Sequence, residues 1–557
     1  MTDWLHPGLM IMLAGLFSPP VRGPLRTALL LGDPLVALIG ICLGHAGAEH
    51  SFSFLNYELQ PVRLDKLGRL FAIIFCLMTF AGALFCYCQA GKGELATAYV
   101  YAGSAVGVTL AGDLITLFVF WEIMAIASTL VIWSGGMQNS RGAGMRYVLI
   151  HLLGGVILMT GIVAYARETG SIQFAAMAAD HFSTWFILAG FLLNAGAPPL
   201  SAWLPDAYPE ASFSGMVFLS AFTTKAAVYV LLRGFPGTEL LVYLGLIMIF
   251  YGIIYALLEN DMRRILAYSI VNQVGFMVCG AGMGTELALN GAAAHAFTHI
   301  IYKALLLMSA GSVLYMTGKR KCTELGGLFQ SMPLTAACGI IGALSISAFP
   351  LTSGFVSKSM LTQASVDDHL FVIWLLLQAA SAGVFLHAGI KFPWFVFFQA
   401  DSGLRPADPP LNMRAAMIFF AFLCIFIGVA PVYFYELLPY GVHYAPYSAD
   451  HVVTQLQLLL FSGLAFFVML PWMQRTLTIS LDFDWFYRRL GPSLWRRLVF
   501  CWGRSNASLG RSLQAYYTRI SMFGRLAFSV TIGQYVALVI VVFMVVLVIF
   551  QWLAQSV

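Results

Sequence analysis

The residues of this chain that could do chemistry are ionisable side chains inside long apolar segments. Glu122 lies in DLITLFVFWEIMAIASTLVIW, and Lys225 lies midway along FLSAFTTKAAVYVLLR. A charge at the centre of a bilayer costs on the order of 2.5–3.5 kcal/mol on insertion scales, and such residues usually mark ion or proton pathways. The alternatives are a structural hydrogen bond for Glu122 and a snorkelling side chain for Lys225. We predict that both residues exchange protons.

A second group of ionisable side chains lies in GAAAHAFTHIIYKALLLMSAG, which contains His295, His299 and Lys303. Spacing of four residues places all three on one face of a helix. A zinc site is disfavoured because no Glu follows the first histidine, as it does in the metalloprotease motif, and because a lysine one turn away would repel a dication. The pattern therefore predicts a proton relay, with no metal.

Two apolar segments are interrupted by proline. The first, FLLNAGAPPLSAWLPDAYPE, contains Asn194 and Pro199, and the second, SISAFPLTSGFVSK, contains Pro350 and then Lys358. Proline removes a backbone donor, and irregular backbone at membrane depth is tolerated where protein or water satisfies it. Paired interruptions in two halves indicate an internal repeat whose half-helices meet at a central site. We expect both segments to line a hydrated path.

Further polar residues are secondary candidates. His151, in MRYVLIHLLGG, can titrate near neutral pH, although a lone histidine on an apolar helix is as often structural. The remaining candidates lie at the ends of apolar segments or continue the polar series, and they are Asp113, Arg146, Asp206, His387 and Lys391.

The elements that must position these residues are membrane-spanning helices. The chain of 557 residues is 60% hydrophobic and 10% charged, against roughly 25% charged residues in soluble proteins. Apolar runs of about 20 residues, the length that spans a bilayer, recur along the sequence and predict about 15 or 16 transmembrane helices. Barrel strands are shorter and alternate in polarity. The fold class is therefore an all-α polytopic membrane protein.

Composition also excludes several functions. The nine cysteines form no CxxC pair. We expect them to act as small apolar side chains, with no disulfides and no metal ligands among them. The sequence has no phosphate-binding loop, dinucleotide fingerprint or cysteine set for an iron–sulfur cluster, so no cofactor is expected. The net charge of +5 resides in loops that flank the membrane and does not indicate nucleic acid.

The distribution of charge predicts the orientation. The first apolar run lacks the basic start of a signal peptide and is expected to stay as a span. Loops after odd-numbered spans are rich in arginine and lysine, whereas the opposite loops are poorer in base and richer in acid, with Arg63 and Lys66 as the main exception. The positive-inside rule then places the basic loops in the cytoplasm and the N-terminus outside. Residues 473–526 mix arginines with aromatics and predict an amphipathic helix along the cytoplasmic interface, before a last span at 527–557.

The motifs together resemble a known family. Over roughly residues 110–360 the chain contains, in order, FVFWE, WLPDAYPEA, TTKAAVYVLLR, NDMRRILAYSIVNQVGF, HAFTHIIYKALLLM and FPLTSGFVSK. This ordered set is similar to the proton-translocating antiporter-like subunits of respiratory complex I and of Mrp-type sodium/proton antiporters. WLPDAYPEA and IKFPWFVFF favour the D-type subunit of the Mrp antiporters.

The resemblance implies a fold and a set of roles. It implies two inverted five-helix repeats, each with a broken helix, and a C-terminal lateral helix that straps neighbouring subunits. We expect N-terminal helices at 1–93, repeats at 94–235 and 236–400, and peripheral helices at 401–472. Implied members of the proton pathway are Glu122, Lys225, His295, His299, Lys303 and Lys358, and we add His151 to them from its own chemistry.

One position departs from the family pattern. The first broken helix usually carries a lysine that pairs with the buried glutamate, and Asn194 occupies that position here. An amide cannot take up or release a proton at neutral pH. Either His151, with Lys225, supplies the missing cation to Glu122, or the first half-channel is weakened and the second carries transport. We favour the first explanation because an unpaired buried charge is expensive.

The function implied is that of a proton-translocating subunit of a multi-subunit Mrp-type cation/proton antiporter in the cell membrane. Its partners would be other membrane subunits, protons, and Na⁺ or K⁺. Alternatives are an ion-pumping subunit of a complex-I-like redox or hydrogenase complex, a subunit of an inorganic-carbon uptake complex, or a non-pumping structural subunit. Any redox catalysis would reside in partner subunits.

Overall fold

The computed structural model describes residues 6–45, 47–54, 57–136, 139–471, 482–491, 493–494 and 497. The chain divides into two compact units, Met1–Ser480 and Leu481–Val557. In the second unit, the structure describes the short π-helix η6 (Phe486–Leu490). Arg488 and Asp484, four residues apart, form an ion pair at 2.6 Å. Apart from residues 482–491, 493–494 and 497, the expected lateral segment at 473–526 and the last span at 527–557 lie outside the described residues.

The first unit consists almost entirely of helices. In its N-terminal part these are α1 (Pro7–Phe17), α2 (Gly23–Leu43), α3 (Lys66–Cys86), α4 (Lys92–Leu110), α5 (Leu114–Trp133), α6 (Ser140–Thr169), α7 (Phe182–Ala195), α8 (Trp203–Ala207), η1 (Tyr208–Glu210), α9 (Gly215–Leu219) and α10 (Thr223–Gly234). They continue with α11 (Leu240–Leu258), α12 (Met262–Met283), α13 (Glu286–Thr317), η2 (Cys322–Glu324), η3 (Leu328–Gln330), α14 (Pro333–Ile346), α15 (Ser353–Asp367), α16 (Phe371–Val384), η4 (Phe385–Lys391), η5 (Trp394–Phe398), α17 (Leu411–Val429), α18 (Pro431–Tyr435) and α19 (Ala449–Met469).

Length and hydropathy make most of these helices candidates for membrane spans. Within the described residues, 11 helical segments are long and apolar enough to cross a bilayer, and three shorter apolar helices accompany them. This confirms the prediction of a helical polytopic membrane protein. The expected total of about 15 or 16 spans stays a prediction.

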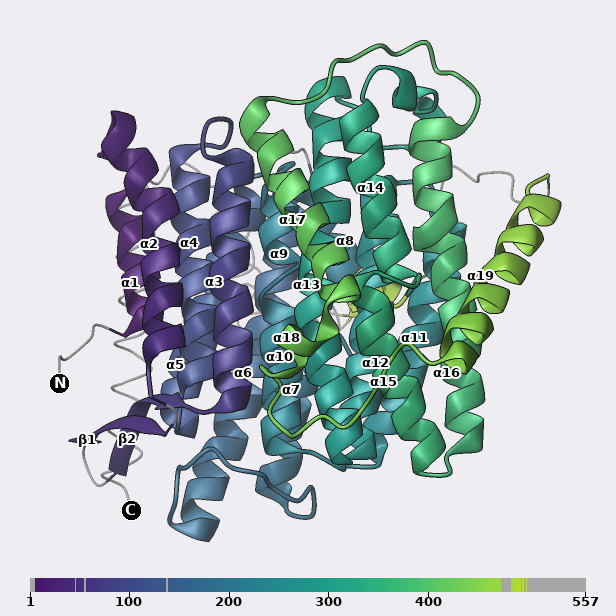
Figure 1. The fold of residues 1–557 in the computed structure, drawn as a ribbon. Coiled ribbons are helices and arrows are strands. Elements are labelled where there is room, and N and C mark those ends of the chain that lie inside the picture. Colours follow the sequence, from purple (N-terminus) through teal and green to yellow (C-terminus); the bar gives the residue numbers. More distant parts are fainter. Residues whose placement is uncertain are drawn as a thin grey trace. The chain divides into compact units, whose positions relative to one another are not determined.

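The central helix of the first unit is α13. It packs against α12, α14, α15 and α17, and Figure 1 shows it among these helices. Every residue from Ala288 to Val313 is buried. The three ionisable residues on this helix therefore lie within protein and do not face lipid.

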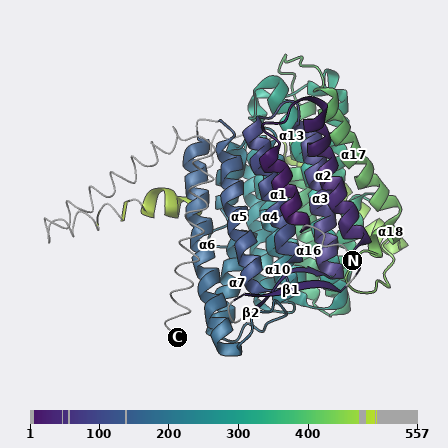
Figure 2. The same ribbon diagram turned by 90° about the vertical axis from the view of Figure 1, so that its left-hand side faces the viewer.

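A β-hairpin precedes α3 and was not predicted. Strands β1 (Ala48–Phe54) and β2 (Tyr57–Leu64) pair antiparallel, with an irregular register between His50 and Phe52. Figure 2 shows the hairpin at one end of the neighbouring helices. The Asp113 carboxylate accepts a hydrogen bond from the Gln60 backbone N–H at 2.8 Å, which holds the hairpin against the start of α5. A search for long apolar runs overlooks a short hairpin, because its side chains alternate in polarity.

Helices stop at both proline-bearing segments. Helix α7 ends at Ala195, followed by Gly196 with a φ of 77°, and the Trp203 indole donates a hydrogen bond to the Leu193 carbonyl at 3.0 Å. In the second segment α14 ends at Ile346 and α15 begins at Ser353. Side chains thus satisfy carbonyls that the helix ends leave free. The inverted relation between two five-helix repeats stays a prediction.

The last apolar segment before residue 400 is helical but irregular. Residues Phe385–Lys391 and Trp394–Phe398 form π-helix, a conformation that occurs mostly as short bulges and frequently at functional sites. His387 and Lys391 both lie on the first of these two π-helical stretches.

A buried row of basic side chains as the candidate functional site

The centre of the candidate site is the polar face of α13. His295, His299 and Lys303 are fully buried. The Lys303 Nζ donates to the Ser269 hydroxyl on α12 at 2.8 Å. The two His295 ring nitrogens lie 3.1 Å from Gln273 Oε1 and 3.0 Å from Ser357 Oγ, so this ring bridges α12 and α15.

His299 differs from its neighbour on the same helix. Neither of its ring nitrogens has a hydrogen-bond partner among the described residues. Lys303 follows His299 by four residues on the same helix, so the two side chains share one face of α13. Buried polar atoms usually have a partner, either protein or ordered water. The two ring nitrogens therefore suit contact with ordered water.

Lys225 occupies the first turn of α10 and is fully buried. Its Nζ donates to the Ser220 carbonyl at 2.8 Å and to the Thr224 hydroxyl at 3.1 Å. The helix is interrupted between α9 and α10, which leaves the Ser220 carbonyl available as an acceptor. The hydrogen bonds of this ammonium group thus go to neutral oxygen atoms.

A chain of hydroxyl groups lies next to Lys225 and was missed from the sequence. Tyr147 OH lies 2.9 Å from Ser128 Oγ and 3.5 Å from Thr223 Oγ1, and Tyr101 OH lies 2.7 Å from Thr223 Oγ1. The chain joins α4, α5, α6 and α10. Hydroxyls both donate and accept, so the chain can pass a proton between these helices. No sequence pattern signals it, since the four residues come from four separate segments.

Glu122 is partly buried on α5, and its Oε1 has no hydrogen-bond partner among the residues that the structure describes. Its carboxylate lies against Gly155 of α6, where an added Cβ would collide with it. His151, one turn earlier on α6, bonds through Nδ1 to the Tyr147 carbonyl at 2.9 Å, and its Nε2 has no partner in the same part of the chain. The expected ion pair between His151 and Glu122 is therefore not formed within the described structure.

Asn194 is buried at the end of α7, and within the described ranges neither atom of its amide has a hydrogen-bond partner. The same holds, over those ranges, for the buried hydroxyl of Ser201 in the following segment. An unsatisfied buried polar group costs about 1–3 kcal/mol. The interruption between α7 and α8 therefore presents polar atoms that suit water molecules.

The second interrupted segment holds Lys358. This buried side chain donates from Nζ to the Ile346 carbonyl at 2.8 Å, at the end of α14, and its Nζ lies 5.0 Å from the centre of the Phe276 ring. Pro350 falls between the two helices, where Ala348 and Leu351 have positive φ angles of 56° and 67°. The interrupted backbone thus supplies the lysine with its acceptor.

The polar series continues on η4. His387 is fully buried, with Nδ1 bonded to the Gly383 carbonyl at 2.8 Å and with no partner for Nε2 in the described part of the chain. The Lys391 Nζ donates to the carbonyls of Ala256 at 3.1 Å and of Glu259 at 2.6 Å. Because cations stabilise the carbonyl end of a helix, Lys391 caps α11, and the row of basic groups ends there.

The other secondary candidates make structural contacts. The Asp113 carboxylate caps α5 by accepting from Thr116 N at 2.7 Å. Arg146 forms a bidentate pair with Asp206, at 2.7 and 2.8 Å, which links α6 to α8. Pro199 lies in the non-helical stretch between α7 and α8.

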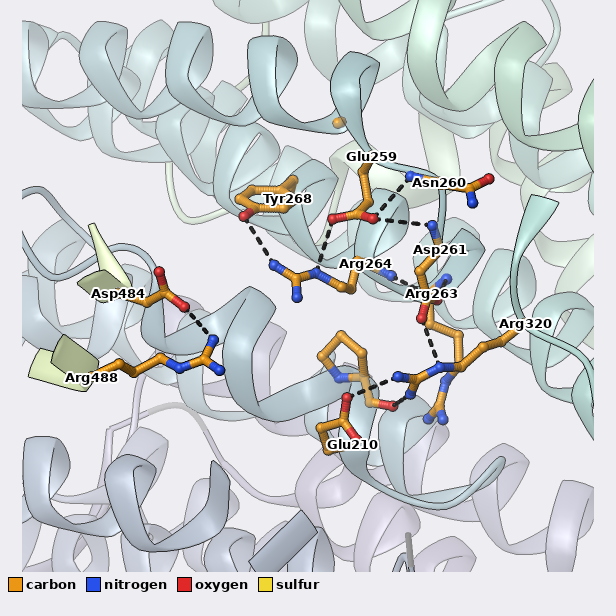
Figure 3. A network of polar contacts seen from close by, with 12 residues as sticks. Glu210, Glu259, Asn260, Asp261, Arg263, Arg264, Tyr268, Arg320, Asp484 and Arg488 are labelled. Atoms are coloured by element: carbon orange, nitrogen blue, oxygen red, sulfur yellow. Dashed lines mark hydrogen bonds and ion pairs between the residues drawn. The ribbon is translucent and has the colours of Figure 1, made fainter. Parts of the chain in front are cut away.

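An ionic network lies beside η1, the start of α12 and the end of α13 (Figure 3). Arg320 contacts Glu210 at 3.0 Å and Asp261 at 2.8 Å, and Arg264 contacts Glu259 at 2.9 Å. Burial raises the pKa of the Asp261 carboxyl above its ordinary value, although the neighbouring guanidinium groups act against this shift. The network ties the segment after the first helix interruption to the helices of the central site.

Comparisons with known proteins show the relatives of this chain. The family model described as NADH:quinone oxidoreductase/Mrp antiporter, TM (Proton_antipo_M) matches residues 111–383, which include Glu122, Lys225, the α13 residues and Lys358. The chain is 30% identical over 408 residues to the A/B-type subunit of a probable K(+)/H(+) antiporter of Rhizobium meliloti, covering 68% of this chain and 40% of that protein. It is 33% identical over 289 residues to the D-type subunit of the Na(+)/H(+) antiporter of Alkalihalophilus pseudofirmus, covering 48% of this chain and 58% of that protein.

More extended matches concern two further proteins. Hydrogenase-4 component B of Escherichia coli is 27% identical over 481 residues, covering 76% of this chain and 71% of that protein. A chain of the Mrp complex from Dietzia sp. has the same fold, with a TM-score of 0.79, 20% identity, and coverage of 94% of this chain and 63% of that one. The chain thus spans less than two thirds of the length of the two antiporter proteins named first. By sequence, the chain belongs to the NADH:quinone oxidoreductase/Mrp antiporter transmembrane family.

Proposed function

We propose that this chain is a proton-translocating subunit of a multi-subunit Mrp-type cation/proton antiporter in the cell membrane. The observation that carries the proposal is the row of buried basic side chains on α10, α13 and α15, whose lysines bond to neutral oxygens. Its relatives named as K(+)/H(+) and Na(+)/H(+) antiporter subunits support the same activity.

The hydrogen bonds of the lysines fit reversible protonation. Within the described part of the chain, Lys225, Lys303 and Lys358 donate to hydroxyl and carbonyl oxygens. Burial disfavours the charged form of an ammonium group, and a neutral acceptor stabilises it less than a carboxylate does. Each lysine can therefore release and regain a proton at modest cost, as a relay requires.

The proposed proton path has two halves. Repeats at 94–235 and 236–400 would each contribute a hydrated half-channel, with His295, His299 and Lys303 joining them. Glu122 is the acidic proton site of the first half, and protons would reach it through water, since its Oε1 has no partner among the described residues. The atoms of His151, Asn194 and His299 that lack partners in the same ranges support a hydrated path.

The proposed surroundings of this core follow from the sequence. Helices at 1–93 and 401–472 would surround the two repeats, and the segments 473–526 and 527–557 would form a lateral helix and a last span. The basic loops that carry Arg263 and Arg320 would face the cytoplasm, with the N-terminus outside. Neighbouring membrane subunits of the same complex would be its partners.

Proton/cation exchange in everted vesicles that contain the whole complex tests the proposal. We expect Glu122→Gln and Lys358→Ala to abolish most of the exchange while the complex still assembles on a native gel. Lys319→Gln, in an exposed ion pair, serves as the control. Full exchange in both variants would reject proton transport by this chain and leave it a structural role.

A second candidate is the ion-pumping membrane subunit of a redox or hydrogenase complex. The length of the sequence match favours this candidate. This chain matches 71% of the length of Hydrogenase-4 component B, against 58% of the length of the D-type antiporter protein. Purification of the intact complex decides between them. Co-purifying iron–sulfur proteins would indicate the redox complex, whereas small antiporter proteins alone would indicate the Mrp type.

A further inference from the structure

A polar cavity of about 250 Å³ lies between α15, α16 and α19. Its lining is rich in side chains that bond to water, unlike the apolar groove between α14 and α19. The polar lining residues that matter below are Lys358, Thr362, Gln363, His451, Thr454 and Gln455. The volume is sufficient for several water molecules.

Lys358 forms the buried end of this cavity. Its side chain is 3% exposed and bonds to the carbonyl at the end of α14. Gln455 of α19 donates to the Ser347 carbonyl in the same interruption at 3.0 Å. Helix α19 is therefore attached to the broken backbone that supplies the acceptor of Lys358.

His451 lies at the other end of the lining, in the first turn of α19. Its Nε2 lies 2.9 Å from Gln363 Oε1, and Gln363 donates from Nε2 to the exposed Asp367 at 2.7 Å. The Nδ1 lies 3.3 Å from both Tyr444 OH and the Pro446 carbonyl. A connected row of polar groups thus leads from an exposed carboxylate to the cavity.

His451 lies on a polar face of α19, although most of this helix is apolar. Most of α19 exposes apolar side chains, such as Leu460 at 71%, as expected of a lipid-facing helix. Polar residues at 451, 454 and 455 share one face, since residues three and four apart are neighbours on a helix, and all three line the cavity. A location at the membrane interface would explain why the first turn of α19 is polar. It would not explain why this polar face lines the same cavity as Lys358.

We propose that His451 carries protons between Lys358 and the membrane face at which α15 ends, with the polar cavity as the water-filled connection. This inference rests on the proposed function, because it gives Lys358 its route to the aqueous phase. Histidine suits the role, since one ring nitrogen can accept a proton while the other donates one. Water in the cavity would carry protons between His451 and Lys358.

The charged and titratable groups that face His451 come from α15, α19 and the loop before α19, whereas α16 contributes none. Asp450 is its neighbour on α19, Asp367 of α15 is reached through Gln363, Tyr444 comes from the preceding loop, and Lys358 lies across the cavity. A protonated ring would therefore have two carboxylates near it on the side of the solvent and a basic group on the side of the protein. This distribution of charge favours exchange of protons between His451 and the solvent at the end of the cavity that holds the carboxylates.

Cysteine labelling tests whether the cavity holds water. In a background with reactive native cysteines replaced, Thr454→Cys would be treated with a charged methanethiosulfonate reagent in right-side-out and everted vesicles of the whole complex. Leu460 on the lipid-facing side of the same helix is 71% exposed and provides the comparison, since lipid excludes a charged reagent. We expect labelling of Thr454→Cys in one of the two orientations, about tenfold or more faster than that of Leu460→Cys. Equal slow labelling of both cysteines would overturn the proposal.

Proton transport tests the role of His451 itself. His451→Gln keeps a polar side chain but cannot carry a proton, and we expect exchange to slow by about tenfold or more. His451→Ala should regain transport when imidazole is added at the labelled face, an effect that a purely structural histidine would not show.

The outcomes separate this inference from the proposed function. Wild-type exchange in His451→Gln, or no rescue by imidazole, while Lys358→Ala is inactive, would overturn the role of His451 and leave the proposed function intact. Full exchange in Lys358→Ala would instead reject the proposed function, and with it the transfer through His451. The labelling would still decide whether the cavity is aqueous.

Discussion

The carboxylate of Glu122 on α5 lies directly against Gly155 on α6, in space that any larger side chain would fill. This contact explains how an acidic group fits between two apolar helices. The lack of a side chain at Gly155 leaves the carboxylate room beside the helix backbone, and in the described structure its Oε1 has no partner. Glycine at this position therefore belongs to the proposed proton site, and the sequence did not mark it.

Gly155→Ala is expected to displace Glu122 and to lower proton exchange about tenfold or more, while costing about 1–3 kcal/mol through overpacking. Gly142→Ala on the same helix is the control, because an added Cβ there meets only the end of the Arg146 side chain. Exchange in vesicles and complex yield on native gels would be measured. Unchanged exchange in Gly155→Ala would show that the position of Glu122 is unimportant.

Tyr147→Phe should slow proton exchange several-fold without loss of the complex. The substitution removes the hydroxyl that lies between Ser128 and Thr223 but keeps the ring that stacks on His151. Tyr165→Phe on the same helix, outside the hydroxyl chain, is the matched control. If the two variants exchange protons equally fast, the hydroxyl chain has no part in transfer.

His151→Ala is expected to reduce exchange, and Asn194→Lys is expected to restore part of it. The ring of His151 packs edge-on against Trp203 at 4.6 Å between centroids, and that tryptophan bonds to the carbonyl of Leu193. The two positions therefore border the same interruption of α7. Exchange would be compared in the single and double variants. Normal exchange in His151→Ala would favour the explanation in which the second half carries transport.

Arg320→Gln is expected to destabilise the protein by about 1–3 kcal/mol. The change leaves Asp261, which is 6% exposed, without its contact at 2.8 Å. Lys319→Gln is the control, since its pair with Glu324 spans 3.9 Å between half-exposed side chains and exposed pairs contribute about 0–1 kcal/mol. Thermal unfolding of the purified complex in detergent measures both, and equal shifts would contradict a special role for the network.

Sequence reasoning predicted the helical membrane class correctly and located the ionisable residues within apolar segments, because both depend on local properties. Hydropathy over about 20 residues decides whether a segment can span a bilayer. A lysine in the middle of such a segment is visible without knowing its neighbours. Both proline-bearing segments were recognised as interrupted, since proline acts on its own backbone. The β-hairpin was missed because short alternating strands give a weak signal.

The sequence alone thus determined which positions of the apolar helices carry ionisable side chains. Which polar groups meet was decided only by tertiary packing. Tyr101 and Thr223 are 122 positions apart and share a hydrogen bond, and His451 reaches Gln363 across 88 positions. His151 was expected to pair with Glu122 but bonds to Tyr147 on its own helix. Such contacts depend on how helices rotate and pack against one another, which the periodicity of a single helix does not specify.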